Sequence, residues 1–183
     1  MNLYKLNDEG SFSITRPYES SQIINIMENL IGNLNNKIIT DATSCMGGDL
    51  INFCNVYKHV NGIEIDENNF ECLVENCKRF NCLNVNLFCQ DYLEIFNKLK
   101  QDVIYIDPPW GGINYKSKNN VKLKINNIDL NIIINNIITN NITKYIFIKV
   151  PNNALLDDMK FSYIIPIFNK NKSVSFKLII IQL

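Results

Sequence analysis

The sequence predicts an α/β protein built on a seven-stranded, mostly parallel sheet, with helices on both faces and a C-terminal antiparallel hairpin. Three observations favour this class. Short apolar runs alternate along the chain with segments of helical periodicity, which is typical of a parallel sheet covered on both faces. The last two apolar runs are separated only by FNKNK, which fits a hairpin. The 183 residues can bury one sizeable core, so we expect a single domain over residues 1–183.

The elements can be assigned in chain order. Residues 1–31 are expected to form an arm and then a helix over 17–31, whose apolar residues share one face. Residues 32–183 would form a Rossmann-like core. Its strands are expected at residues 37–41, 59–64, 84–88, 103–107 and 144–150, with the hairpin at 163–167 and 173–182. Its helices are expected at 48–56, 66–80, just after 91 and around 129–139. The Asn pairs at 119–120 and 126–127 are expected in loops or at helix edges.

Charge and composition exclude several classes of protein. The net charge is zero and the pI is about 6.6, which argues against broad, salt-driven binding to long nucleic acid but not against binding a short RNA. No apolar stretch approaches the roughly 20 residues of a membrane helix. The first ten residues, MNLYKLNDEG, are too acidic and polar for a signal peptide. We therefore expect a soluble, intracellular monomer, in the nucleus or the cytoplasm.

The cysteines do not indicate a metal site. Six are present, but none forms a CxxC pair, and His59 is the only imidazole. We expect reduced, mostly buried thiols and no bound metal.

Acidic residues end or follow three successive predicted strands: Asp41, Glu64 and Asp91. In open α/β sheets, ligands bind outside the carboxyl ends of the strands, near the reversal of strand order. Glu64 could accept both hydroxyls of a ribose, and Asp91 the amino group of adenine. Taken singly, Glu64 also fits a solvated acid and Asp91 a helix N-cap. Together the three acids predict a nucleoside pocket, with the spacing of a class I S-adenosylmethionine methyltransferase fold.

A glycine pair, Gly47 and Gly48, lies in the turn after the first predicted strand. Glycines there let a ligand approach the backbone, and the following helix N-terminus favours anionic groups. The GxGxxG spacing is absent, so a plain tight turn is the alternative interpretation.

The fourth predicted strand ends in DPPWGG, residues 107–112. A D/N-P-P-aromatic tetrapeptide in this position is typical of methyltransferases that act on planar exocyclic or amide nitrogens. Such a nitrogen is a poor nucleophile because its lone pair is delocalised. Hydrogen-bond acceptors must draw its protons and turn the lone pair toward the methyl donor. We expect Asp107 and the carbonyl of Pro108 to do this, while Trp110 stacks on the base.

With these motifs, the chain resembles the trimethylguanosine synthases, the cap-specific guanine-N2 RNA methyltransferases, over nearly its whole length. The matching stretches are FSIT (12–15), DA…GG (41–48), EID (64–66), QDY (90–92), DPPWGG…Y (107–115) and VPNNA (150–154). The resemblance implies S-adenosylmethionine as cofactor and 7-methylguanosine-capped RNA, or a cap analogue, as partner. It also implies that Trp110 stacks on 7-methylguanine, whose positive charge makes a cation–π contact favourable.

The resemblance assigns residues to three roles. The cofactor would be held by Ser13, Thr15, Asp41, Thr43, Gly47, Gly48, Glu64, Asp91 and Asp107. The substrate would be held by Trp110, Tyr115, Lys116, Lys118 and Asn153, and the catalytic group would be Asp107, Pro108 and Trp110. Four lysines fall within residues 116–124 of an otherwise neutral chain. We expect Lys116 and Lys118 to bind cap phosphates, a solvated basic loop being the alternative.

Five positions depart from the family pattern, and two of them, Arg16 and Pro17, are arranged differently from its T-P-E. Cys45 replaces a usual glycine, Asp107 stands where the cellular enzymes often have Ser, and Asn152 replaces a basic residue. The compact, Asn-rich chain would suit a large DNA virus, and then the host cytoplasm, or an AT-rich protist. Two other functions stay open: the same chemistry on DNA adenine N6 or ribosomal RNA guanine N2, and a catalytically silent cap- or cofactor-binding module.

Overall fold

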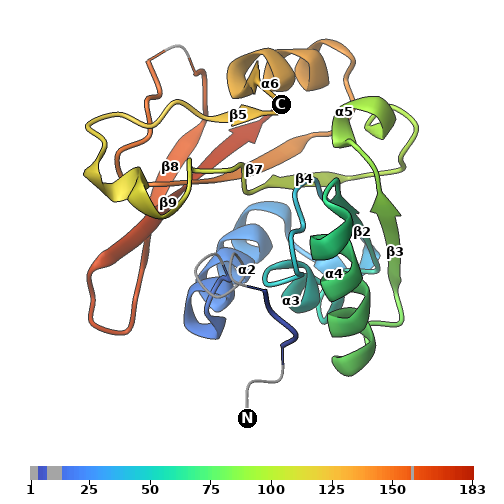
Figure 1. Cartoon of the computed structure of the whole chain (residues 1–183). Helices are drawn as coiled ribbons and strands as arrows, with labels where there is room; N and C mark the ends of the chain where they lie inside the picture. The colour runs from blue at the N-terminus through green and yellow to red at the C-terminus, as the bar shows by residue number, and fades with distance from the viewer. Residues whose placement is uncertain (1–3, 8–13, 158) are drawn as a thin grey trace.

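The computed structural model describes residues 4–7, 14–157 and 159–183 (Figure 1). Within these residues the main sheet has seven strands in the order β3-β2-β1-β4-β7-β9-β8. The strands are β1 (Ile38–Asp41), β2 (His59–Glu64), β3 (Val85–Cys89), β4 (Val103–Ile106), β7 (Tyr145–Val150), β8 (Tyr163–Phe168) and β9 (Val174–Gln182). β1, β2, β3, β4 and β7 pair in parallel, whereas β9 pairs antiparallel with both β7 and β8. The predicted sheet and closing hairpin are confirmed.

Helices cover both faces of the sheet, as predicted. In Figure 1, α2 (Pro17–Ile31), α3 (Leu50–Cys54) and α4 (Glu67–Arg79) lie on one side, and α5 (Tyr92–Ile95) and α6 (Leu130–Thr139) on the other. Alternate residues of the strands point to opposite faces of the sheet and belong to two apolar clusters. Tyr105 and Phe147 pack with the first group of helices, while Ile104 and Ile148 pack with the second. The expected helix at 48–56 is shorter than predicted, because residues 48–49 and 55–56 form turns.

Strand order reverses between β1 and β4, and this reversal positions the site. From β1 the chain builds outward through β2 and β3, then returns to add β4 and β7 on the other side of β1. Asp41 lies beside Tyr105 in the register, so the end of β1 and the residues after β4 meet at one edge of the sheet. This edge is where ligands bind in open α/β sheets.

One small hairpin was not predicted: β5 (Lys124–Ile125) pairs antiparallel with β6 (Ile128–Asp129). Its turn consists of Asn126 and Asn127, at φ 48° and 65°. Two consecutive left-handed residues make the tight turn that suits strand twist, and Asn tolerates this conformation better than most residues. Interpreting the Asn pair only as a loop therefore missed the strands that it joins. No helix in the described ranges is long and apolar enough to span a bilayer.

Candidate active site

A cavity of about 1160 Å³ opens at the carboxyl ends of β1, β2 and β4. Its walls come from the N-terminal arm, the turns after these strands, residues 108–118, and the β8–β9 end of the sheet. Most of the residues assigned from the sequence line it: Thr15, Asp41, Thr43, Gly48, Glu64, Asp91, Asp107, Pro108, Trp110, Tyr115, Lys116, Lys118 and Asn153. Ser13 lies outside the described residues.

The turn after β1 is closed against the arm and the core. Gly47 has φ 90°, and a Cβ there would lie 2.8 Å from Leu73 Cδ1; this glycine is not part of the cavity wall. At Gly48 a Cβ would lie 2.8 Å from Ile14 Cγ1, so the missing side chain admits the N-terminal arm. Cys45, where the family has glycine, adopts φ 47°, a left-handed conformation that glycine takes at lower cost. The turn thus keeps the glycine-type geometry with a thiol on the cavity wall.

Glu64 and Asp91, the acids at the end of β2 and just after β3, have different hydrogen-bond partners within the protein. Glu64 is 9% exposed, and its Oε1 accepts the backbone N–H of Asp66 at 2.8 Å. Burial raises the pKa of Glu64, and backbone N–H groups oppose the rise. Asp91 caps α5 by accepting the Leu93 N–H at 2.9 Å, and its other oxygen accepts Asn126 Nδ2 at 2.6 Å. Asp91 is therefore a helix N-cap that also lines the cavity.

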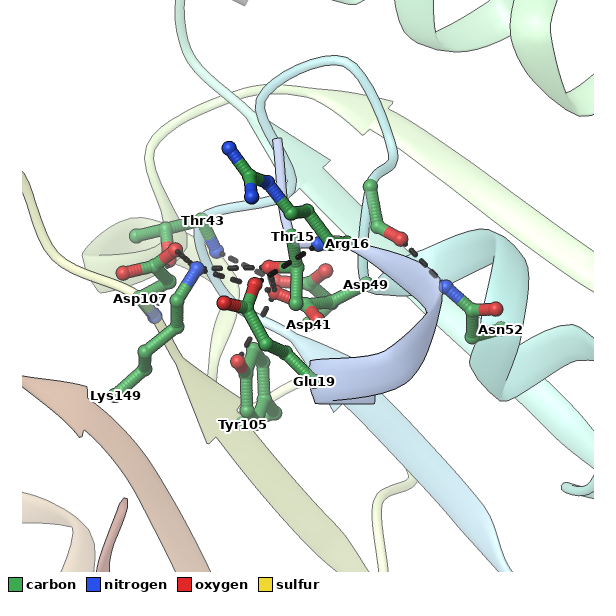
Figure 2. A network of polar contacts seen from close by, with 11 residues as sticks. Thr15, Arg16, Glu19, Asp41, Thr43, Asp49, Asn52, Tyr105, Asp107 and Lys149 are labelled. Carbon is green, nitrogen blue, oxygen red and sulfur yellow. Dashed lines mark hydrogen bonds and ion pairs between the residues drawn. The ribbon is translucent and has the colours of Figure 1, made fainter. Parts of the chain in front are cut away.

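The buried ammonium of Lys149 connects several residues at the centre of the site (Figure 2). Lys149 of β7 is 3% exposed; its Nζ donates to Asp107 Oδ2 at 2.6 Å and to Thr15 Oγ1 at 2.8 Å. Asp49 Oδ2 lies 3.7 Å from this Nζ and accepts the hydroxyls of Thr15 at 2.7 Å and Tyr105 at 3.0 Å. One cation thus connects the arm, the turn before α3, the residue after β4, and β7.

Sequence reasoning missed both Lys149 and Asp49. Lys149 lies in the apolar run YIFIKV, which was assigned as a core strand, and Asp49 follows the glycine pair. A signal was present, because a lysine inside a strand buried on both faces needs a buried anion as partner. That partner was identifiable only as one of several acids at neighbouring strand ends.

Burial and like charges dominate the electrostatics of the cluster. Burial raises the pKa of Asp107 to about 6, with Lys149 opposing the rise and Asp49 adding to it. Burial raises the pKa of Asp41 well above its usual range, and Asp49 raises it further. For Lys149, burial lowers the pKa, but the attraction of Asp107 and Asp49 outweighs burial and raises it. The two acids Asp49 and Asp107 face the single buried ammonium of Lys149, so this end of the cavity favours a cationic ligand.

Aromatic rings form the wall beside Asp107. The Trp110 ring lies 5.1 Å from that of Tyr115, edge-on at 75°, and 6.3 Å from that of Phe176. Phe176, from β9, was not predicted as a site residue. Lys149 Nζ lies 5.5 Å from the Trp110 ring centre and 5.0 Å from that of Phe176. The half-buried Trp110 presents part of its surface to the cavity.

Backbone contacts hold the segment after Trp110 in place. Asn153 Nδ2 donates to the carbonyls of Tyr115 at 2.9 Å and Lys118 at 2.7 Å, and so ties down η2 (Ile113–Ser117). Thr43 acts similarly, since its Oγ1 accepts the Asp107 N–H at 2.8 Å. These two predicted ligand-binding residues therefore also position other residues of the site.

The thiols differ partly from expectation. All six cysteines lie in the described residues and none forms a disulfide, but only Cys72 and Cys77 are buried, while Cys89 is exposed. Cys89 ends β3, one of the two edge strands of the sheet, which pairs with β2 alone among the described strands. The expectation of mostly buried thiols was therefore wrong. Among the described residues, no group of three or more His, Cys, Asp or Glu side chains is placed to hold a metal ion.

The strand order, the closing hairpin and the cavity at the switch point define the fold of the class I S-adenosylmethionine-dependent methyltransferases. A solved chain from Porphyromonas gingivalis W83 superposes with a TM-score of 0.75 at 15% identity, covering 99% of this chain and 44% of that one. A 16S rRNA N2 methyltransferase of Thermus thermophilus, in complex with AdoMet and guanosine, superposes with a TM-score of 0.67 at 13% identity, covering 94% and 44%. These similarities establish the fold alone.

Sequence comparison identifies the family. The family model of the RNA cap guanine-N2 methyltransferases matches residues 36–181, and the chain belongs to this family. An uncharacterized protein of Acanthamoeba polyphaga mimivirus is 30% identical over an alignment of 141 residues, and the match covers 74% of this chain and 55% of that protein. The chain thus spans about half the length of this relative.

The buried acid Asp41 provides a test of the site electrostatics. Its raised pKa means that the folded protein holds this proton more tightly than the unfolded chain. Its contribution to stability is therefore full below about pH 4 and is lost as the pH rises above that value. Asp41→Asn should raise the free energy of unfolding at pH 7 and have a smaller effect at pH 4, as measured by urea denaturation. The exposed Asp157→Asn is the control and should change neither value. A loss of stability at pH 7 in Asp41→Asn would contradict the assignment.

Proposed function

We propose that this chain transfers a methyl group from S-adenosylmethionine to the exocyclic N2 amine of a 7-methylguanosine RNA cap. The product is 2,7-dimethylguanosine, and 2,2,7-trimethylguanosine after a second transfer. The observation that carries the proposal is the DPPWGG motif, which places Asp107, Pro108 and Trp110 on the wall of the cavity that also contains the strand-end acids. Membership of the cap guanine-N2 family supports the same substrate.

The residues present fit S-adenosylmethionine. Glu64 lies at the end of β2, where a carboxylate accepts ribose hydroxyls, and Asp91 lines the cavity after β3. The methionine portion would lie toward Asp41, Thr43, Gly48 and Thr15. When bound, the cofactor supplies a methyl group activated by a positively charged sulfur. The surplus of buried acids around Lys149 suits that charge.

Asp107 and Pro108 would position the amine. The Asp107 side chain is 21% exposed, and Lys149 holds its Oδ2. The carboxylate and the Pro108 carbonyl would accept the N–H groups of N2, so that its lone pair points at the methyl carbon. Methylated N2 must release one proton, and Asp107 on the cavity wall would accept it. Lys149 would act as a positioning residue that keeps this carboxylate ionised.

Trp110 would bind the base. A half-buried indole flanked by Tyr115 and Phe176 offers a rigid surface for stacking, and the delocalised charge of 7-methylguanine strengthens it. Lys116 and Lys118 line the same cavity and would bind the cap phosphates.

A second candidate function is methylation of a neutral base, such as guanine in ribosomal RNA or adenine in DNA. The observation that favours it is the ammonium of Lys149, 5.5 Å from the Trp110 ring centre, which would repel a cationic base. Asp107 and Asp49 offset this charge, and for that reason the cap remains the first candidate.

The proposed reaction can be tested by incubating the protein with S-adenosylmethionine and 7-methylguanosine triphosphate, and measuring the mass of the product. A gain of one or two methyl groups is expected. GTP, adenine-containing DNA and ribosomal RNA serve as competing substrates. Methylation of GTP as readily as of the 7-methylated nucleotide would favour the second candidate. Binding of both ligands without any product would indicate a silent binding module.

Trp110→Ala tests the stacking contact. Loss of one aromatic platform should weaken binding of 7-methylguanosine triphosphate by about 1–3 kcal/mol, by analogy with base stacking elsewhere. The affinity for S-adenosylmethionine should equal that of the wild type, because the acidic residues proposed to hold the cofactor lie at the ends of other strands. Isothermal titration measures both affinities, and Trp110→Phe should retain most of the cap affinity. Equal cap affinity in wild type and Trp110→Ala would rule out stacking.

Lys149 tests the role of the ion pair through the pH dependence of methylation. The acid limb of the rate profile should lie near pH 6, where Asp107 ionises. In Lys149→Met the ammonium no longer lowers the Asp107 pKa, so the limb should move to higher pH. At pH values below the acid limb, the rate of the variant should be about tenfold lower than that of the wild type for each pH unit by which the limb moves.

Lys149→Arg is the matched control for that experiment, because it keeps the charge and should keep the limb near its wild-type position. Circular dichroism checks folding, since an unpaired buried carboxylate costs about 3–5 kcal/mol. A rate lowered equally at every pH would assign Lys149 a purely structural role.

A further inference from the structure

A second cavity of about 600 Å³ lies beside the first and shares Pro109, Trp110, Lys118 and Asn126 with it. Lys122 and Lys124 line the second cavity only. We name this cavity the lysine groove, after Lys118, Lys122 and Lys124. Its wall includes Trp110, the residue proposed to stack on the base, so the groove begins beside the proposed cap site.

The groove concentrates positive charge in a protein whose net charge is zero. Between Asp107 and Asp129 the sequence has four lysines and no acidic residue. Three of these lysines line the groove, and Asn120, Asn126 and Asn127 add uncharged polar groups to its wall. Ammonium and amide N–H donors together suit phosphate oxygens.

The strand-like segment at residues 121–125 explains why its lysines share one side. Val121, Leu123 and Ile125 are 4%, 4% and 7% exposed, so the residues between them face outward. The backbone is held at both ends: Val121 N–H donates to the Asn153 carbonyl at 2.8 Å, and β5 pairs with β6. Lys122 and Lys124, two residues apart, are therefore anchored about 6.6 Å from each other.

Lys122 and Lys124 both form ion pairs with Asp129. Asp129 lies 2.9 Å from Lys122 Nζ and 3.6 Å from Lys124 Nζ. The three side chains are 61%, 46% and 31% exposed, and ion pairs in such surroundings contribute only about 0–1 kcal/mol. A phosphate can therefore replace Asp129 as the partner of these ammonium groups at little cost.

From this arrangement we propose that the lysine groove binds phosphates of the RNA nucleotides that follow the cap. This inference rests on the proposed function and extends it from the cap to the RNA chain. The groove contacts would be independent of base sequence and dependent on salt, because they are made to the backbone. The protein would then bind a capped RNA more tightly than the isolated cap nucleotide.

The test compares two ligands across variants: 7-methylguanosine triphosphate, and a five-nucleotide RNA carrying the same cap. In Lys122→Ala/Lys124→Ala, affinity for the capped RNA should fall about tenfold at low salt. The slope of log K against log salt should become shallower by about 1.4, since each single-strand phosphate contact contributes about 0.7. Affinity for the cap nucleotide should stay within about twofold of wild type.

Two control variants separate site-specific from general effects. Lys78→Ala/Lys98→Ala removes the same charge from exposed positions that line neither cavity, and should leave both affinities unchanged. Lys122→Arg/Lys124→Arg keeps the charge and should keep the affinity for capped RNA.

The outcomes distinguish this inference from the proposed function. Wild-type affinity for capped RNA in Lys122→Ala/Lys124→Ala would overturn the proposed role of the groove. Equal losses of affinity for the capped RNA and the cap nucleotide would also overturn it. An equal loss in the Lys78→Ala/Lys98→Ala control would do the same. If the wild type fails to methylate the cap nucleotide yet binds uncapped RNA through Lys122 and Lys124, the groove stands and the cap specificity falls. If it binds no RNA at all, the groove is overturned as well.

Discussion

The buried ammonium of Lys149 is the interaction on which the arrangement of this site depends. It joins Asp107 after β4, Thr15 in the N-terminal arm and Asp49 before α3 to β7. These groups come from four separate parts of the chain. Without the cation, the carboxylates of Asp49 and Asp107 would lie near each other with no positive charge between them, which is unfavourable. The pairing therefore sets where Asp107 points and brings the arm against the cavity.

The same cluster shows a conflict between stability and ligand binding. Burial raises the pKa of both Asp41 and Asp107, so each of these acids weakens the folded state in its charged form. Acids kept in this condition at the switch point of an open sheet favour a functional role over a structural one. A cationic ligand would relieve the excess negative charge, and this requirement links the fold of the site to the chemistry proposed for it.

Local patterns were sufficient where each residue's role followed from its place on a strand. Short apolar runs set the strands, and Asp41, Glu64 and Asp91 follow them as expected, while DPPWGG brought Trp110 to the cavity. Contacts between distant segments were not readable in this way. Phe176 of β9 and the pairing of Lys149 with Asp107 depend on how separate elements pack. Gly48 is a further case, since its missing side chain makes room for Ile14 of the arm. The β5–β6 hairpin is different, because its signal was the local Asn pair that forms its turn.

The sequence by itself determined the fold class, the family resemblance and most of the cavity wall, because these depend on periodicity and on the residues that end each strand. Tertiary structure alone decided which acids share a cation and which rings flank Trp110. It also decided that three lysines line a second groove beside this residue. The physical reason is that electrostatic and packing partners are selected by distance in space, and residues 107 and 149 become neighbours only when β4 and β7 pair in the sheet.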